Sequence, residues 1–369
     1  MRTRWIYGLV LIAATAFVAT EAGAQAAPGA LFIESNSQSE NTILKFNRLE
    51  DGRIQPAGEF STGGKGTGAG LGNAGALALS RDDRFIFAVN AGSNDISVLA
   101  ITEGGLRLID RKPSGGLYPI SVTENHGIVY VLNNGSAAGG VDNISGFRVS
   151  KRGYLTAISG STRPLSAPAV GPAQVRFDEE GETLIVTEKN TNIIDTYSLN
   201  EIGLANGPSS IPSNGATPFG FAVGKRGQVF VTDAAGGTPN ASALSAYELS
   251  DTGLHAIGGA SATHQTSACW AATTHDGRFV YTANTGSNTI SGFSIGHDGR
   301  VTLLNADGRT APTEGAPADL GFSNGDRFLY VVNGASHSIS GFRVFEDGSL
   351  SPVGGFSGLP AGTTGLAVR

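Results

Sequence analysis

Residues 275–299 read HDGRFVYTANTGSNTISGFSIGHDG, and the parts of this stretch return in the same order along the chain. A polar turn is followed by the apolar run FVYTAN (279–284) and then by a loop of Gly, Asn and Ser. Ile290 comes next, with Phe293 three positions later, and a turn at Gly299 ends the stretch. Apolar runs of this length, separated by glycine-containing turns, are typical of short β-strands joined in antiparallel hairpins.

The same unit returns about every 50 residues, as expected of a repeat protein. Its third strand carries Ile or Leu and, three positions later, a large apolar residue: Ile43 and Phe46, Ile96 and Leu99, Ile144 and Phe147, Ile194 and Tyr197, Leu244 and Tyr247, Ile290 and Phe293, Ile339 and Phe342. The turn that follows contains Gly52, Gly105, Gly153, Gly203, Gly253, Gly299 and Gly348, at intervals of 53, 48, 50, 50, 46 and 49 residues. The sequence therefore contains seven units.

The second strand of each unit is apolar on both sides, as in FIFAVN (85–90), TLIVTE (183–188) and FLYVVN (328–333). Such strands are expected where a sheet packs against a neighbour on each face. Four short strands per unit predict an all-β fold, a seven-bladed β-propeller of four-stranded antiparallel blades. A pair of β-sandwiches would leave the sevenfold repeat unexplained, and Gly, Pro or Asn-Gly breaks interrupt every potential helix.

The two ends of the chain complement each other. ALFIESN (30–36) reads as a second strand with no first strand before it, and the chain stops after GLAVR (365–369). This last segment resembles the first strands ALALS (76–80) and GFAVG (220–224). We therefore expect the C-terminal strand to join the N-terminal blade and close the ring, so that deletion of residues 364–369 opens it.

Residues 1–24 have the pattern of a secretory signal peptide. Arg2 and Arg4 form a basic start, an apolar run follows, and Ala22-Gly23-Ala24 is a small-residue cleavage site. Because the run is short for a bilayer span, we expect cleavage, a periplasmic or secreted location and no stable membrane insertion. A retained membrane anchor is the alternative. Residues 25–369 are then expected to form a single propeller domain.

The composition argues against nucleic-acid binding and against an intramolecular disulfide. Without the leader, 25 basic and 31 acidic residues become 23 and 30, so the formal charge changes from −6 to −7. Such a chain is not expected to bind nucleic acid. Cys269 is the only cysteine, which excludes an intramolecular disulfide.

In a propeller, the second-to-third loops and the segments between blades share one face, and the long loops of this sequence belong to that face. We predict that residues there bind a substrate. The candidates either enter a first strand or end a second strand: Gln174, Phe219, Asp233, Trp270, Asn284 and Asn333. The alternative is structural, since Asn and Asp commonly bond to nearby backbone.

The fourth blade departs from the others, with Arg176 in its first strand and Glu188 and Lys189 ending its second. A charge in an otherwise apolar strand needs a partner, and Glu188 is the expected partner of Arg176. The pair is either structural or catalytic. We therefore predict Arg176, Glu188, Lys189 and His264 as catalytic residues, the last because a histidine titrates near neutral pH. His264 and Cys269 are not expected to act as a nucleophile pair.

No chemistry is assigned to His275 and His297, which lie in hairpin turns on the opposite face. The sequence has none of the usual motifs for a hydrolytic serine, a metal ion or a phosphate-binding loop. We therefore expect neither a metal nor a cofactor.

The repeated pattern DGRFxYxxN, as in residues 276–284, resembles seven-bladed lactonase-type propellers related to bacterial 6-phosphogluconolactonase and fungal carboxymuconate lactonizing enzyme, with strands of the Tyr-Val-Thr-Asn type. The resemblance spans residues 25–369. It implies a lactonase-like hydrolase acting at the central funnel, with Arg176 and Glu188 as counterparts of the family's Arg and Glu.

Gln174 stands where the resemblance implies a histidine. Arg176 or Lys189 could still polarise a lactone carbonyl while Glu188 or His264 activates water. The sequence therefore leaves two functions open: a monomeric enzyme that hydrolyses or forms a small lactone, and a non-catalytic propeller that binds a component of the cell envelope.

Overall fold

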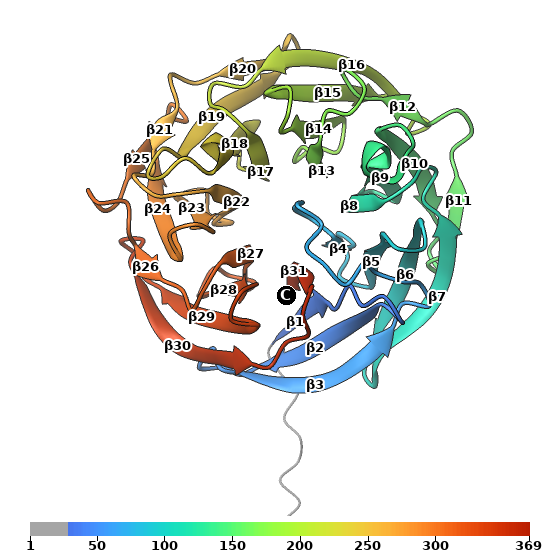
Figure 1. Cartoon of the computed structure of the whole chain (residues 1–369), viewed down its shortest axis with the longest axis horizontal. Helices are drawn as coiled ribbons and strands as arrows, with labels where there is room; N and C mark the ends of the chain where they lie inside the picture. Colours follow the sequence, from blue (N-terminus) through green and yellow to red (C-terminus); the bar gives the residue numbers. More distant parts are fainter. Residues whose placement is uncertain (1–28) are drawn as a thin grey trace, which may run out of the picture.

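A computed structural model describes residues 29–369, and in it seven antiparallel sheets stand around a central axis (Figure 1). The predicted fold class is confirmed. The signal peptide predicted for residues 1–24 lies outside the described residues. Within residues 29–369, no helix is long and apolar enough to cross a membrane.

Each sheet is one blade. Blade one contains β1 (Gly29–Glu34), β2 (Thr42–Arg48), β3 (Ile54–Ser61) and β31 (Thr364–Val368). Blade two contains β4 (Leu77–Leu79), β5 (Phe85–Asn90), β6 (Asp95–Thr102) and β7 (Gly105–Pro113). Blade three contains β8 (Pro119–Asn125), β9 (Ile128–Asn133), β10 (Asn143–Val149), β11 (Leu155–Ala157) and β12 (Arg163–Pro164). Blade four contains β13 (Pro172–Phe177), β14 (Thr183–Glu188), β15 (Ile193–Leu199) and β16 (Ala205–Pro212).

Blade five contains β17 (Pro218–Val223), β18 (Gln228–Asp233), β19 (Ala243–Ser250), β20 (Gly253–Ala256) and β21 (Ser261–Ala262). Blade six contains β22 (Ala268–Thr273), β23 (Phe279–Asn284), β24 (Thr289–Ile295), β25 (Val301–Leu303) and β26 (Ala311–Pro312). Blade seven contains β27 (Pro317–Phe322), β28 (Phe328–Asn333), β29 (Ser338–Val344) and β30 (Leu350–Ser357). The outermost strand of blades three, five and six is divided into two short strands.

The C-terminal strand closes the ring as predicted. β31 pairs antiparallel with β1, with Phe32 opposite Ala367 and Ile33 opposite Leu366. It is the innermost strand of blade one, whose other three strands begin the described chain. Both ends of the described chain therefore belong to one sheet.

The repeated turn glycines pack between blades. A Cβ atom on Gly52 of blade one would overlap the ring of Phe328 in blade seven, and Gly52 has φ of +90°, which favours glycine. The hydroxyl of Tyr330 donates a hydrogen bond to the Gly52 carbonyl at 2.7 Å. Tyr281 and Gly348 repeat this bond between blades six and seven. The regular spacing of these glycines in the sequence thus reflects a contact between a turn of one blade and a side chain of the blade before it.

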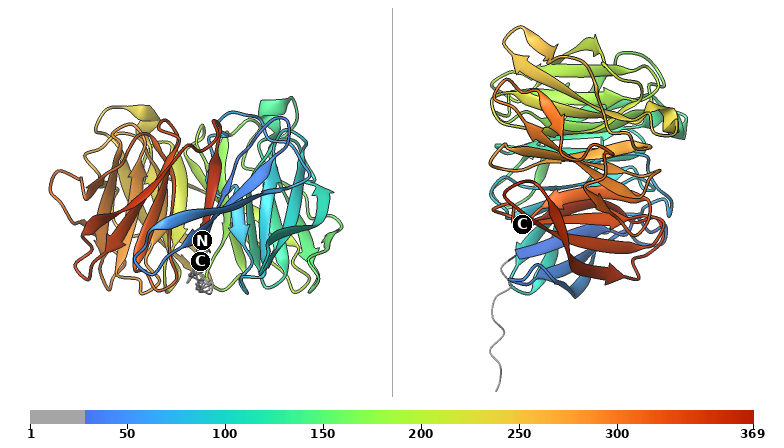
Figure 2. Two further views of the ribbon diagram at one scale, coloured as in Figure 1. Left: turned by 90° about the horizontal axis from the view of Figure 1, so that it is seen from below. Right: turned by 90° about the vertical axis from the view of Figure 1, so that its left-hand side faces the viewer.

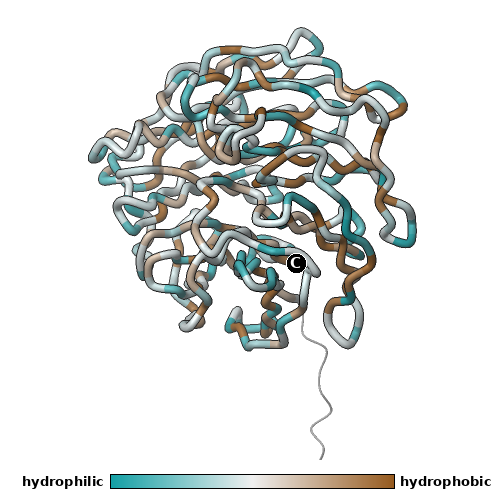
Figure 3. The backbone as a smooth tube through the Cα atoms, turned by 45° about the vertical axis from the view of Figure 1, so that its right-hand side comes forward, coloured by the Kyte–Doolittle hydropathy of each residue, from teal (hydrophilic) through white to brown (hydrophobic). Residues whose placement is uncertain are grey.

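The hydrophobic core lies between neighbouring blades. The second strand of each blade is buried on both faces of its sheet, because it packs against a blade on each side. β5, β23 and β28 are buried at every position. Hydrophobic stretches accordingly run along the inner strands, while hydrophilic stretches are common in the connecting loops (Figure 3).

The ring has two distinct faces. The loop face carries the second-to-third loops, including the short 3₁₀ helices η1 (Gly135–Ala138) and η2 (Ala235–Gly237). The turn face carries the first-to-second and third-to-fourth turns, and the C-terminus lies toward it (Figure 2). Every first strand runs from the loop face to the turn face, so residues early and late in such a strand reach opposite mouths of the central channel.

Candidate active site at the turn face

The channel mouth at the loop face is filled by residues 71–75, which we call the plug segment. The chain enters β4 from the middle of the ring (Figure 1). The Asn73 carbonyl accepts a hydrogen bond from the Trp270 indole at 3.0 Å, and the Ala74 amide donates to the Ala173 carbonyl at 3.0 Å. The Asn73 side chain also bonds to Ile120 and Thr364. The plug segment is therefore tied to blades one, three, four and six.

Four of the predicted site residues lie around the plug segment or next to it. Lys189 donates a hydrogen bond to the Gly72 carbonyl, and its ammonium nitrogen lies 4.9 Å from the centre of the Phe219 ring. Burial lowers the pKa of Lys189 to about 8. The Phe219 and Trp270 rings lie 5.3 Å apart. Gln174 accepts a hydrogen bond from the backbone of blade five. The structure brings these residues together, but Lys189, the Trp270 indole and the side-chain oxygen of Gln174 are already hydrogen-bonded to protein.

Arg176 and Glu188 do not form the expected ion pair. Arg176 lies opposite Ile185 in the β13–β14 ladder, three residues from Glu188 or about 10 Å along the strand. Glu188 is fully buried, and its carboxylate accepts hydrogen bonds from the hydroxyls of Ser166 and Thr191 at 2.5 Å each. Glu188 therefore bonds within blade four, while Arg176 reaches the opposite mouth.

Three of the predicted residues end a second strand and form a hydrogen bond with the third strand of their own blade. Asn284 donates to the Ser291 hydroxyl at 2.8 Å, and Asn333 donates to the Ser340 hydroxyl at 2.9 Å. Asp233 accepts from the Ser245 hydroxyl at 2.5 Å, and burial raises the pKa of Asp233 to about 7. These side chains are buried and bonded within the protein, and a role for them in substrate binding stays a prediction.

His264 and Cys269 have different surroundings. His264 lies on an exposed loop with φ of +56°. Cys269 is buried, and burial raises the pKa of its thiol to about 11. A thiol with such a pKa is a poor nucleophile, in line with the sequence analysis.

The mouth at the turn face is open. A cavity of about 590 Å³ lies there, and all seven blades line it with the ends of their first strands or the following turns. The charged or titratable residues in its lining are Arg81, Asp83, Glu124, Arg176, Asp178, Glu179, Lys225 and His275. A cavity of this size with convergent polar groups is the expected form of a small-molecule site.

His275 and Asp326 form a pair at this mouth. Nδ1 of His275 lies 2.5 Å from Oδ1 of Asp326, and the other carboxylate oxygen, Oδ2, accepts a hydrogen bond from the His275 backbone N–H at 2.7 Å. A carboxylate can only accept, so Nδ1 carries the hydrogen and Nε2 is left free. The hydrogen bond that His275 donates to Asp326 raises the pKa of His275 above its ordinary value, while partial burial and the charge of Arg176 oppose this shift.

Arg176 extends into the same cavity from blade four. Its side chain is exposed to solvent within the cavity. The channel wall around it reduces its hydration, which lowers the pKa of Arg176, and the negative charge of Asp319 opposes that shift. An arginine remains charged after such a change. Asp319 is buried, and its carboxyl accepts backbone hydrogen bonds from Leu320 at 2.8 Å and Leu366 at 2.9 Å. Burial raises the pKa of Asp319 to about 7.

From the sequence, His275 was not expected to line a cavity, but it lies in the wall of this one. The His-Asp-Gly turn at 275–277 has the same residues as the turn at 297–299. The turn sequence alone therefore does not tell which of the two histidines faces the channel. The available signal was strand direction. Arg176 comes near the end of a first strand, which places it at the turn face together with the first-to-second turns.

This arrangement can activate water and stabilise negative charge. A histidine with one nitrogen held by a carboxylate presents the other as a general base. A cation beside it can stabilise the oxyanion that forms when a carbonyl is attacked. Arg176 and His275 supply these two elements on one cavity.

The sequence model of the family described as lactonase, seven-bladed beta-propeller, matches residues 37–163 and 240–364. Similar solved structures include a putative 6-phosphogluconolactonase from Bacteroides fragilis, at 17% identity and a TM-score of 0.71, covering 92% of this chain and 98% of that one. Another, from Bacteroides uniformis, has 20% identity and a TM-score of 0.70, covering 92% and 99%.

A periplasmic gluconolactonase from Pseudomonas aeruginosa has 16% identity and a TM-score of 0.72, covering 92% of this chain and 98% of that one. At such identities, the likeness shows the fold. No curated protein matches the sequence.

Proposed function

Because the chain belongs to the family of lactonases with a seven-bladed β-propeller, we propose that it hydrolyses a small lactone at the turn-face mouth. The observation that carries this proposal is that Arg176 and His275 line one open cavity, with His275 held by a hydrogen bond to Asp326. Neighbours named as gluconolactonases support a sugar-acid lactone as the substrate class.

In the proposed reaction, each of these groups has one role. His275 accepts a proton at Nε2 from a water molecule, and the water oxygen attacks the lactone carbonyl carbon. Arg176 stabilises the negative charge on the former carbonyl oxygen. The ring C–O bond then breaks, and the proton on His275 passes to the leaving alkoxide oxygen, which gives a hydroxy acid. Asp326 orients the imidazole and stabilises its protonated form.

The substrate class also fits the charges of the cavity. Arg176 and Lys225 come from adjacent blades, and Lys225 makes no ion pair with a described residue. These cations favour a lactone that carries an anionic substituent or many hydroxyl groups. Glu124 and Asp178 offer acceptors for such hydroxyls.

Acid release from a panel of lactones tests the proposal. The panel contains glucono-δ-lactone, 6-phosphoglucono-δ-lactone and γ-butyrolactone, each measured above its spontaneous rate with a pH indicator. We expect turnover of a sugar-acid lactone and a loss of about 100-fold in kcat/KM for Arg176→Gln. Arg309→Gln, an exposed arginine on blade six, is the control. Absence of turnover across the panel, or equal activity of Arg176→Gln, contradicts the proposal.

The plug segment favours a second candidate function, the binding of an envelope component without catalysis. Four predicted site residues surround or adjoin a filled mouth, so the loop face offers a closed surface at its centre. This function predicts that the wild-type protein turns over no lactone while it retains a partner from envelope extracts.

Export is part of the proposal. Its support is the sequence pattern of residues 1–24 and the periplasmic relative from Pseudomonas aeruginosa. N-terminal sequencing of the protein from a secreting host tests it, and a mature chain that begins at Gln25 is expected. Recovery of the intact leader on membrane-bound protein contradicts export by cleavage.

A further inference from the structure

Three adjoining cavities form a groove on the turn face, running outward from the channel mouth between blades two and three. The central cavity shares Ser80, Arg81 and Glu124 with a second cavity of about 390 Å³. That cavity shares Arg84, Phe85 and Lys151 with an outer one of about 420 Å³. We call the second and outer cavities together the radial groove.

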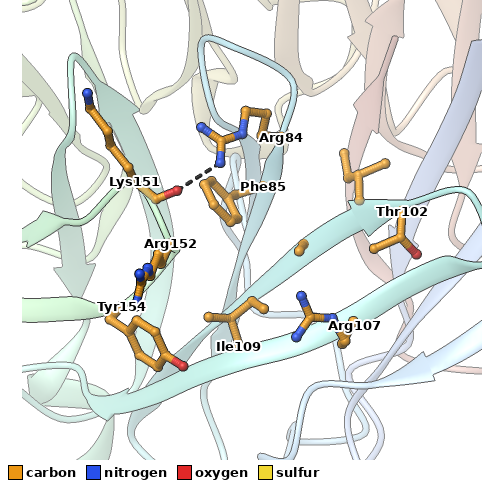
Figure 4. Close-up of a pocket in the computed structure, with 10 residues that line it drawn as sticks. Arg84, Phe85, Thr102, Arg107, Ile109, Lys151, Arg152 and Tyr154 are labelled. Carbon is orange, nitrogen blue, oxygen red and sulfur yellow. Dashed lines mark hydrogen bonds between the residues drawn. The ribbon is translucent and has the colours of Figure 1, made fainter.

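The outer part of the radial groove is strongly basic. Arg84, Arg107, Lys151 and Arg152 line it, and its lining contains no acidic residue (Figure 4). Arg84 donates a hydrogen bond to the Lys151 carbonyl at 2.8 Å and lies 3.6 Å from Asp82. The other three cations are exposed and form no ion pair within residues 29–369.

Such a concentration of cations is unexpected on a chain with a formal charge of −6. Like charges around one cavity repel each other, and this repulsion is relieved when an anion binds between them. The outer cavity therefore has the electrostatics of an anion site.

The rest of the radial groove defines the kind of anion. Tyr154 is 54% exposed at the outer cavity, and its ring offers an apolar face to a flat ligand. Asp82 and Glu124 line the second cavity, among its cations. Carboxylates accept hydrogen bonds from hydroxyl groups, but they repel a polymer with one phosphate per residue.

We propose that the radial groove binds an oligosaccharide that carries widely spaced carboxylate or sulfate groups. The anionic groups contact Arg107, Lys151 and Arg152, a sugar ring stacks on Tyr154, and hydroxyl groups bond to the carboxylates of the second cavity. This inference rests on binding alone and does not depend on the proposed hydrolysis.

Calorimetric titration of the full protein with trigalacturonate tests the inference, and a chondroitin sulfate tetrasaccharide serves as the sulfated probe. We expect binding of at least one of them, weakened by added salt. The double variant R107Q/R152Q removes two charge-assisted contacts, so the Kd of that ligand rises about tenfold or more. Arg309→Gln is the matched control and binds as the wild type does.

Maltotriose and a ten-residue oligothymidylate test whether both sugar and charge are needed. Failure of both anionic sugars to bind, an unchanged Kd in the double variant, or equally tight binding of maltotriose or oligothymidylate overturns the inference. Asp326→Asn, which lies outside the radial groove, separates the two proposals. If the catalytic proposal is right, this variant alters lactone hydrolysis; in either case it leaves oligosaccharide binding intact.

Discussion

Replacing Asp233 with asparagine is expected to stabilise the protein at neutral and alkaline pH. Asp233 ends the second strand of blade five, is 1% exposed and accepts hydrogen bonds from the hydroxyls of Ser245 and Ser213. Four other blades have an asparagine at this position, and its amide donates to a serine hydroxyl of the third strand: Asn90, Asn133, Asn284 and Asn333. An amide at residue 233 therefore fits the blade.

The sign and size of the effect follow from the pKa of Asp233, which burial raises from 3.8 to about 7. Between these values, the folded protein retains a proton that the unfolded chain releases. Stability is therefore lost as pH rises through this window, and the loss is complete above the folded pKa. The full shift corresponds to ~4 kcal/mol, and water penetration reduces what is measured. We expect Asp233→Asn to gain about 1–3 kcal/mol over the wild type between pH 4.5 and pH 8.5.

Urea unfolding followed by fluorescence at the two pH values measures this gain. Taking the difference between variant and wild type at each pH removes the contribution of the other carboxyls. The reverse substitution, Asn284→Asp, is the matched control and should lose stability mainly at pH 8.5. A difference for Asp233→Asn that does not change with pH, or a loss of stability at pH 8.5, would refute the reasoning.

Other predictions concern ring closure, the thiol and the catalytic pair. Deletion of residues 364–369 removes the inner strand of blade one, and we expect loss of the cooperative thermal transition; an unchanged melting curve contradicts this. Tyr330→Phe removes the hydrogen bond to the Gly52 carbonyl, and we expect the free energy of unfolding to fall by about 1 kcal/mol. Urea unfolding measures this change, and an unchanged free energy of unfolding contradicts it. Cys269 should react with a thiol reagent only after unfolding, and rapid labelling of the native protein would disprove its burial. His275 must be neutral to act as base, so activity rises with pH through its raised pKa; Asp326→Asn should move this rise to lower pH, and an unmoved profile assigns the base elsewhere.

The repeat predicted the fold because one physical contact recurs around the ring. In six of the seven third-to-fourth turns, the glycine lies against a side chain of the preceding blade, as Gly52 lies against Phe328 and Gly348 against Phe279. This constraint keeps the glycine spacing regular, and a regular spacing can be counted without a structure. The closing strand was predictable for the same reason, since it repeats the pattern of the other first strands.

The site was harder to predict because its parts come from segments that the repeat does not relate. The plug segment at 71–75 contacts blades on the far side of the ring through backbone groups, and such contacts leave no periodic pattern. Arg176 was identified as unusual, but its neighbours depend on which end of the strand it occupies. His275 and Asp326 meet only because turns of adjacent blades lie side by side.

The most direct test of the account compares the two mouths of the channel. The measurement is kcat/KM for glucono-δ-lactone in His275→Asn, at the open mouth, and in Lys189→Met, at the plugged mouth. We expect kcat/KM to fall about 100-fold or more in His275→Asn and to stay close to the wild-type value in Lys189→Met. A large loss in Lys189→Met with normal activity in His275→Asn would place the chemistry at the loop face and contradict the account.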